Sequence, residues 1–135
     1  MEDPLHREIL EEHARSPGHQ SSLEPPAGES EWTSPKTGNF CSVAIILGDG
    51  RIGAIQAKAE GSALAVACSS LMGSAVVGIT VEEALGLAKS VIEFLEDDKE
   101  TSLPGDLVVY ESIIRFPERH DCAMLAWRAL VLSLK

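Results

Sequence analysis

The sequence predicts an α+β fold in which helices cover one face of a small antiparallel sheet of about three strands. Three observations lead to this prediction. An amphipathic segment opens the chain, two strand-like runs with a tight turn between them follow, and the remaining half has helical periodicity. By length, residues 1–135 form a single domain with one hydrophobic core.

The first element is a helix that ends near Arg15. Asp3 and Pro4 supply an N-cap and a proline at the first helical position, and apolar residues then recur on one face. The sequence SPGHQ ends this helix. Residues 20–34, with two prolines and a glycine, predict a loop with a short edge strand near Trp32.

Two strands come next, FCSVAIIL at 40–47 and RIGAIQAKAE at 51–60. The GDG between them predicts a hairpin, because glycine and aspartate tolerate the positive φ of such turns. Gln56 and Lys58 alternate with apolar residues, so the second strand has one solvated and one buried face. A strand, and no helix, follows GDG, which argues against a phosphate-binding loop.

Helices fill the rest of the chain. Residues 62–77 are apolar on nearly every side, as expected of a helix buried against other elements. Thr80 and Glu83 have the spacing of a capping box and open the next helix.

A solvated connector at 96–106 leads to a short helix at 107–114 and to the last helix, which begins at Pro117. Three residues of this last helix are expected in the core: Leu125, Trp127 and Leu130.

Composition excludes several classes of function. A net charge of −10 speaks against nucleic acid as a partner. The longest apolar stretch, 63–78, is too short for a membrane span, and the acidic start does not resemble a signal peptide, so we expect a cytoplasmic protein. The three cysteines form no CxxC pair and predict no disulfide framework. No GxSxG motif or P-loop suggests a hydrolase.

Five segments, in order, carry a resemblance to a known family: LHREILEEHARSPGH, SPKTGNF, AEGSALAVACSSLM, GITVEEAL and RFPERHDCAMLAWRAL. Over essentially its whole length the chain resembles the U-type iron–sulfur cluster scaffold proteins (IscU, NifU and SufU). The length of the late connector is similar to that of the SufU-like branch. The resemblance implies the α+β fold predicted above and work beside a cysteine desulfurase or another iron–sulfur assembly protein.

The resemblance also marks four metal-ligand positions, and three of them lack the family residue. Thr37 and Ser62 stand where the family has cysteines, Asn39 stands where it has an aspartate, and Cys122 alone is retained. Zinc and iron–sulfur clusters need thiolate, imidazole or carboxylate donors. The resemblance therefore implies a degenerate ligand set.

Other residues offer little to rebuild the site. Cys41 lies roughly 13 Å along a strand from Thr37, and Cys68 lies roughly 9 Å along a helix from Ser62, so both are expected to be buried core thiols. His120 and Asp121 are two further donors beside Cys122. We expect no cofactor, and zinc or a cluster only if such donors rebuild the site.

Two functions remain open. In the first, the protein is an accessory of iron–sulfur assembly, and Cys122 accepts sulfur from the desulfurase. A position near a helix start favours a thiolate, while the neighbouring Asp121 opposes it. In the second, Cys122 is a relic and the protein is a non-catalytic interaction module or regulator. Enzymatic activity is not expected beyond sulfur transfer through Cys122. His13 matches a family histidine and is expected only to cover the edge of the first helix.

Overall fold

The computed structural model describes residues 4–19, 28–97, 103–114 and 116–134. Its elements, in order, are α1 (Pro4–Arg15), β1 (Gly28–Thr33), β2 (Phe40–Gly48), β3 (Arg51–Glu60), α2 (Ala63–Val76), α3 (Val81–Asp97), the 3-10 helix η1 (Gly105–Val109), α4 (Tyr110–Ile113) and α5 (Pro117–Ser133). This order of one helix, three strands and a run of helices confirms the predicted α+β class.

The three strands form one antiparallel sheet in the order β1-β2-β3. The predicted hairpin joins β2 to β3, with Gly48 paired to Arg51. Between them Asp49 and Gly50 both have positive φ, 54° and 77°, the backbone that a two-residue hairpin turn needs. The edge strand expected near Trp32 is β1, and residues 20–27 of the predicted loop lie outside the described residues.

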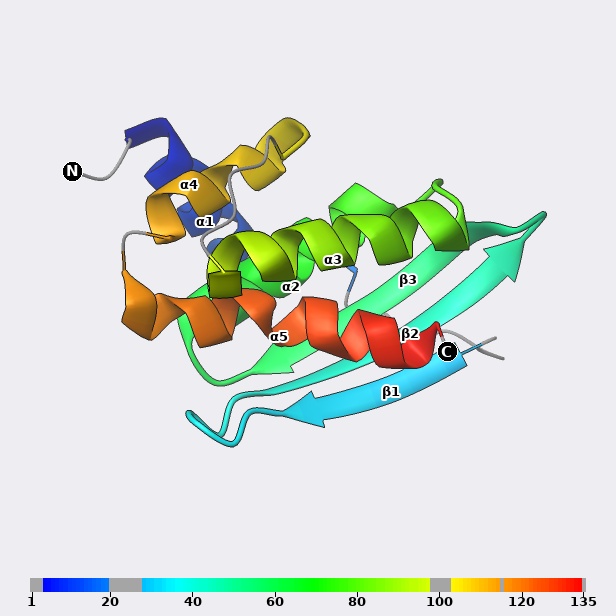
Figure 1. The fold of residues 1–135 in the computed structure, drawn as a ribbon, viewed down its shortest axis with the longest axis horizontal. Coiled ribbons are helices and arrows are strands. Elements are labelled where there is room, and N and C mark those ends of the chain that lie inside the picture. The colour runs from blue at the N-terminus through cyan, green and yellow to red at the C-terminus, as the bar shows by residue number, and fades with distance from the viewer. Residues whose placement is uncertain (1–3, 20–27, 98–102, 115, 135) are drawn as a thin grey trace.

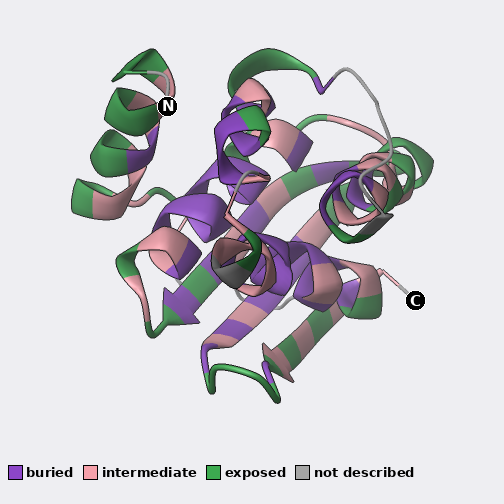
Figure 2. Cartoon of the chain, turned by 60° about the vertical axis from the view of Figure 1, so that its left-hand side comes forward, coloured by how far each residue is buried: buried purple, intermediate pink, exposed green. Residues whose placement is uncertain are grey.

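Helices α2 and α5 lie side by side on one face of the sheet (Figure 1). Helix α2 contacts β3, and α5 contacts β1 and β2. Helices α1 and α3 form an outer layer, α1 against α2 and α3 against α5. Burial is concentrated where α2 and α5 meet the sheet, while the outer faces of α1 and α3 are exposed (Figure 2).

The core centres on two fully buried aromatic residues. Trp127 of α5 donates a hydrogen bond from Nε1 to the hydroxyl of Tyr110 over 2.9 Å, so both polar atoms are satisfied inside the protein. Leu125 and Leu130 are also buried, which confirms the core predicted for the last helix.

Two of the predicted helix starts are present, and Asp3, the N-cap predicted for the first helix, lies outside the described residues. Thr80 and Glu83 form a reciprocal capping box, with bonds of 3.0 Å and 3.1 Å between each backbone nitrogen and the other side chain. Pro117 opens α5. Among the described residues, no helix is long and apolar enough to cross a bilayer.

Two element boundaries differ from the prediction. Helix α3 continues to Asp97, so Glu96 belongs to a helix and not to the connector; residues 98–102 lie outside the described part of the chain. The single helix expected at 107–114 begins earlier and divides into η1 and α4. The reason is the tight turn after Pro104, where Leu107 N bonds the Pro104 carbonyl over 3.1 Å and Gly105 has a φ of 57°.

Candidate functional site

The candidate site lies where the start of α5 meets the start of α2 and the β1–β2 loop, residues 34–39. The loop supplies Thr37 and Asn39, Ser62 precedes α2, and Cys122 lies near the start of α5. Asn39, Ser62 and Cys122 are in direct contact, while Thr37 is linked to them through backbone and Asp121. The four positions marked by the family resemblance therefore converge in space.

Asn39 is held in one orientation by Ser62. Its Oδ1 accepts the backbone N–H of Ser62 over 3.2 Å, so its Nδ2 faces the other way and donates to Cys122 Sγ over 3.1 Å. Gly61 allows this contact, because a Cβ there would lie 1.9 Å from Asn39 Oδ1 and because its φ is 131°. The Asn39 amide is thus packed tightly over the Gly61 backbone.

Ser62 provides a second hydrogen bond to the same sulfur. As the N-cap of α2, its Oγ accepts from Ala65 N over 3.1 Å, and its hydroxyl proton is directed to Cys122 Sγ at 3.3 Å. The Cys122 side chain is largely covered, with 8% relative exposure. Its sulfur therefore accepts two hydrogen bonds in a nearly closed environment.

Thr37 forms a hydrogen bond with Asp121, the residue before Cys122, and not with Cys122 itself. Its Oγ1 donates to Asp121 Oδ2 over 3.2 Å and accepts Asn39 N over 3.2 Å. The same carboxylate oxygen accepts the hydroxyl of Ser34. Through these two hydrogen bonds, Asp121 links the β1–β2 loop to α5.

Ser34 is a site residue that the sequence prediction missed. It is 2% exposed, and its Oγ also accepts the backbone N–H groups of Lys36 and Thr37 over 3.1 Å and 3.2 Å. A serine followed within three residues by turn formers is typical of a side chain that caps its own loop. That signal was present in SPKTG.

His120 makes its hydrogen bond outside this network. Its Nε2 lies 2.8 Å from the carbonyl oxygen of Ile114. A carbonyl only accepts, so Nε2 carries the proton. Of the two donors predicted beside Cys122, Asp121 is in the network and His120 is bonded to the preceding turn. In the described part of the chain, no three His, Cys, Asp or Glu side chains are grouped closely enough to hold a metal ion.

The other two cysteines are core thiols, as predicted. Cys41 and Cys68 are fully buried, and burial raises the pKa of the Cys41 thiol to about 11 and that of the Cys68 thiol to about 12. His13 does more than cover a helix edge, since its Nδ1 is hydrogen-bonded to Ser70 Oγ of α2 at 2.7 Å.

Residues 5–135 match the family described as NifU-like N terminal domain. The chain belongs to this family. Because the match spans nearly every residue, the family covers the fold and the candidate site together.

Two characterised relatives cover most of this NifU-like chain. It is 27% identical over 133 residues to the iron-sulfur cluster assembly scaffold protein IscU of Streptococcus pyogenes serotype M1, an alignment of 97% of this chain and 83% of the relative. It is 26% identical over 131 residues to the zinc-dependent sulfurtransferase SufU of Bacillus subtilis (strain 168), covering 95% of this chain and 88% of SufU.

Solved structures share the fold of this NifU-like domain. A putative iron-sulfur cluster assembly scaffold protein for the SUF system, from Fervidobacterium islandicum AW-1, superposes with a TM-score of 0.85 at 21% identity over 95% of both chains. The N-terminal part of a NifU-like protein from Brucella abortus gives a TM-score of 0.83 at 21% identity, over 93% of this chain and 89% of that one. The predicted fold and family resemblance are confirmed.

Proposed function

We propose that this NifU-like protein is a cytoplasmic accessory of iron–sulfur cluster assembly that docks on a cysteine desulfurase without holding zinc or a cluster of its own. The observation that carries the proposal is the pair of hydrogen bonds on Cys122 Sγ. Asn39 and Ser62 point N–H and O–H groups at the sulfur, at 3.1 Å and 3.3 Å. A metal centre needs lone pairs converging from these positions.

The donor set at the four positions does not fit such a centre. Thr37, Asn39 and Ser62 offer neutral hydroxyl and amide groups, which bind zinc and iron weakly compared with thiolates and carboxylates. The carboxylate of Asp121, next to Cys122 in the sequence, already accepts hydrogen bonds from Ser34 and Thr37 at Oδ2.

The same geometry suits a sulfur acceptor. The Cys122 thiolate would attack the outer sulfur of a persulfide on the desulfurase cysteine. The S–S bond breaks, the desulfurase cysteine leaves as a thiol after taking up a proton, and Cys122 keeps the outer sulfur as a persulfide. Asn39 and Ser62 each direct a hydrogen-bond donor at Sγ, the atom that makes the attack. No external oxidant is required.

The limited exposure of Cys122 favours a second candidate, an interaction module that binds the desulfurase and regulates it without accepting sulfur. Cys122 is 8% exposed, and Asn39 and Ser62 both lie against its sulfur, so little of it is open to a partner. Thr37, Asn39 and Ser62 are similar in size to cysteine and aspartate, so they preserve the shape of the docking region in either case.

Elemental analysis of the purified protein tests whether the four positions still hold zinc or an iron–sulfur cluster. We expect anaerobically purified protein to contain zinc, iron and acid-labile sulfide far below one equivalent per chain. A restored variant, Thr37→Cys with Asn39→Asp and Ser62→Cys, should bind one zinc ion, because it rebuilds three thiolates and a carboxylate. Near-stoichiometric metal in the unaltered protein that disappears in Cys122→Ala would overturn the proposal.

Sulfur transfer separates the two candidates. The protein is incubated with the cysteine desulfurase of the same organism and ³⁵S-cysteine, beside Cys122→Ala and, as a matched control, Cys41→Ala. Label on the unaltered protein and on Cys41→Ala, but not on Cys122→Ala, supports the acceptor. Equal desulfurase binding by all three proteins with no transferred label supports the regulator. Failure of all three to bind the desulfurase contradicts both candidates.

A further inference from the structure

A cavity of about 640 Å³ lies beside the candidate site, lined by the end of α3, by α5, and by Trp32 of β1 with the β1–β2 loop. We call it the α3–α5 pocket. Six of the residues that line it matter here: Trp32, Lys36, Leu95, Glu96, Met124 and Arg128. Its volume is within the range of roughly 300–1,000 Å³ that is usual for small-molecule sites. Thr37 and Asp121 belong to its wall, so the pocket and the candidate site share the β1–β2 loop.

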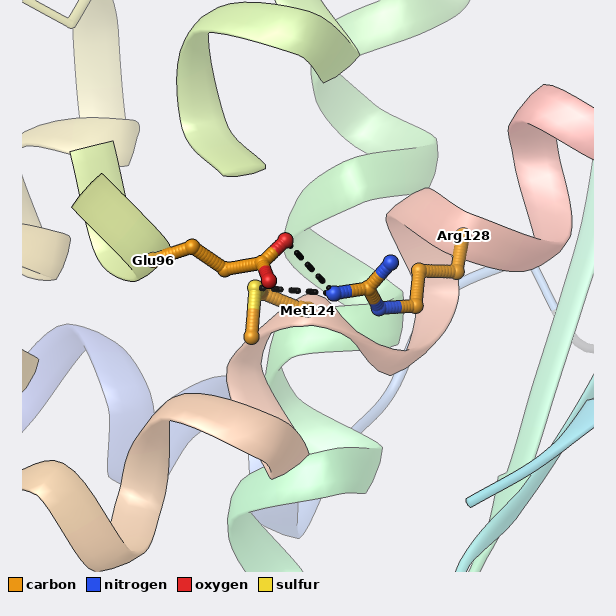
Figure 3. A network of polar contacts seen from close by, with 3 residues as sticks. All are labelled: Glu96, Met124 and Arg128. Atoms are coloured by element: carbon orange, nitrogen blue, oxygen red, sulfur yellow. Dashed lines mark hydrogen bonds and ion pairs between the residues drawn. The ribbon is translucent and has the colours of Figure 1, made fainter. Parts of the chain in front are cut away.

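Arg128 is held in position at one end of its guanidinium group. Its Nη2 donates to Glu96 Oε1 over 2.7 Å and lies 3.8 Å from Met124 Sδ (Figure 3). Figure 3 also shows the other terminal nitrogen turned away from both partners. A guanidinium has five N–H donors, so a pre-oriented cation retains donors for a ligand.

Lys36, in the β1–β2 loop, supplies a second cation to the wall of the pocket. Within the described residues its ammonium group has no ion-pair partner, and the backbone of Lys36 is fixed by Ser34. The two acidic groups in the wall already have partners, because Glu96 binds Arg128 and Asp121 accepts from Ser34 and Thr37. In a chain with a net charge of −10, the uncommitted donors in this pocket are therefore cationic.

Besides these charged groups and the polar side chains of Thr37 and His120, the wall contains the apolar residues Trp32, Pro35, Leu95, Pro117 and Met124. Trp32 is half-buried, and Leu95 and Met124 are buried at 2% and 5% exposure. An indole and a thioether adapt to aromatic and aliphatic ligands alike.

We propose that the α3–α5 pocket binds a small organic monocarboxylate, with its apolar body on Trp32 and Met124 and its carboxylate between Lys36 and Arg128. The charges favour a single anionic group. Lys36 and Arg128 can donate hydrogen bonds to one carboxylate, but Glu96 and Asp121 balance the two cations, so the wall has no net positive charge for the additional charges of a phosphate or polyphosphate. This proposal does not depend on the desulfurase partner or on sulfur transfer.

The test is a titration of the ¹⁵N-labelled full chain with phenylacetate, beside its neutral counterpart phenylacetamide. The two tryptophans give two indole N–H signals, and Trp127, buried and bonded to Tyr110, serves as the internal reference. We expect phenylacetate to shift the Trp32 signal saturably, with a Kd on the order of millimolar for a ligand of this size. The amide should bind at least about threefold more weakly, because it lacks the charge.

Charge variants locate the carboxylate. Lys36→Gln and Arg128→Gln should each weaken phenylacetate binding about two- to fivefold, and Lys58→Gln, the same change on the open sheet face, should leave the Kd unchanged. Glu96→Gln keeps Arg128 and removes a wall carboxylate, so it should tighten binding. Equal affinity for the amide, no saturable Trp32 shift, or the same Kd in Lys36→Gln and Lys58→Gln would overturn the proposal.

Discussion

Asn39 and Cys122 are 83 residues apart in the sequence, yet the amide nitrogen of one lies 3.1 Å from the sulfur of the other. The contact joins the β1–β2 loop to α5 at the candidate site. It puts a hydrogen-bond donor where the resemblance places a metal-binding carboxylate. The polar groups of the site thus hydrogen-bond to one another. Their contribution to the stability of the protein can be tested independently of any function.

Replacing Asn39 by alanine should destabilise the protein. The variant removes the acceptor of the Ser62 N–H and the donor to Cys122, both in covered positions. We expect the free energy of unfolding to fall by about 1–3 kcal/mol, measured by urea denaturation. Lys58→Ala, at an exposed position of β3, should change it by less than about 0.5 kcal/mol. Equal effects of the two substitutions would contradict the Asn39 contacts.

Gly61 should tolerate no side chain. In Gly61→Ala the new methyl group would lie 1.9 Å from Asn39 Oδ1, on a backbone with a φ of 131°. The strain alone should cost about 1–3 kcal/mol, and displacement of Asn39 adds to it. Gly53→Ala is the control in β3, because a Cβ there meets its nearest atom, the Ile46 carbonyl oxygen, at an ordinary 3.6 Å. Thermal unfolding of both variants checks the prediction, which fails if Gly61→Ala melts no lower than Gly53→Ala.

Gly86 should behave in the opposite way. It is exposed in the middle of α3, with ordinary helical φ and no atom within 4 Å of the position of a Cβ. Gly86→Ala should therefore stabilise the protein by about 0.5–1 kcal/mol, because alanine restricts the unfolded chain. A decrease in the urea midpoint would show that α3 is not a regular helix at this residue.

Opening the β1–β2 loop should expose Cys122. Asp121→Ala removes the acceptor shared by Ser34 and Thr37, so the loop loses two bonds to α5. If this costs about 1.4 kcal/mol, the alkylation of Cys122 should accelerate about tenfold. The rate is followed by mass spectrometry with iodoacetamide. Asp106→Ala, an exposed acid of η1, is the matched control and should leave the rate unchanged.

The buried thiols should make stability sensitive to alkaline pH. The pKa of Cys41 is raised by burial to about 11 and that of Cys68 to about 12, from an ordinary value of 9.0. Above pH 9 the unfolded chain releases protons that the folded chain keeps. The stability from these thiols is therefore complete below pH 9 and declines above it, until the pH has passed the folded-state pKa values of about 11 for Cys41 and about 12 for Cys68. Urea denaturation between pH 8 and 11 measures the decline, and it should be smaller in Cys68→Ala.

Local patterns in the sequence were sufficient to predict most of the fold. GDG encodes the hairpin because Asp49 and Gly50 accept positive φ, and the Thr80–Glu83 pair encodes a helix start because both bonds lie within one turn. The division of the 107–114 helix was not predicted, since it depends on the turn after Pro104. Helical periodicity does not distinguish a 3-10 start from an α-helix.

The candidate site was predicted only in part, because its contacts join distant segments. The resemblance identified Thr37, Asn39, Ser62 and Cys122, but no sequence pattern shows that two of them donate hydrogen bonds to the sulfur. The role of Ser34 depends on the packing of its loop against Asp121 in α5. The α3–α5 pocket depends on three separate segments coming together and has no sequence signature.

Strand β1 is an edge strand of the sheet, and its exposed residues affect whether two molecules can associate through this edge. In the part of the chain that the structure describes, β2 is the one strand paired with β1. An open strand edge invites pairing with a second molecule. Glu29 and Glu31 alternate along β1 as exposed residues, so two such edges brought together would set carboxylates of like charge side by side. We therefore expect these two glutamates to disfavour pairing of two β1 edges, because the repulsion between their charges opposes the contact.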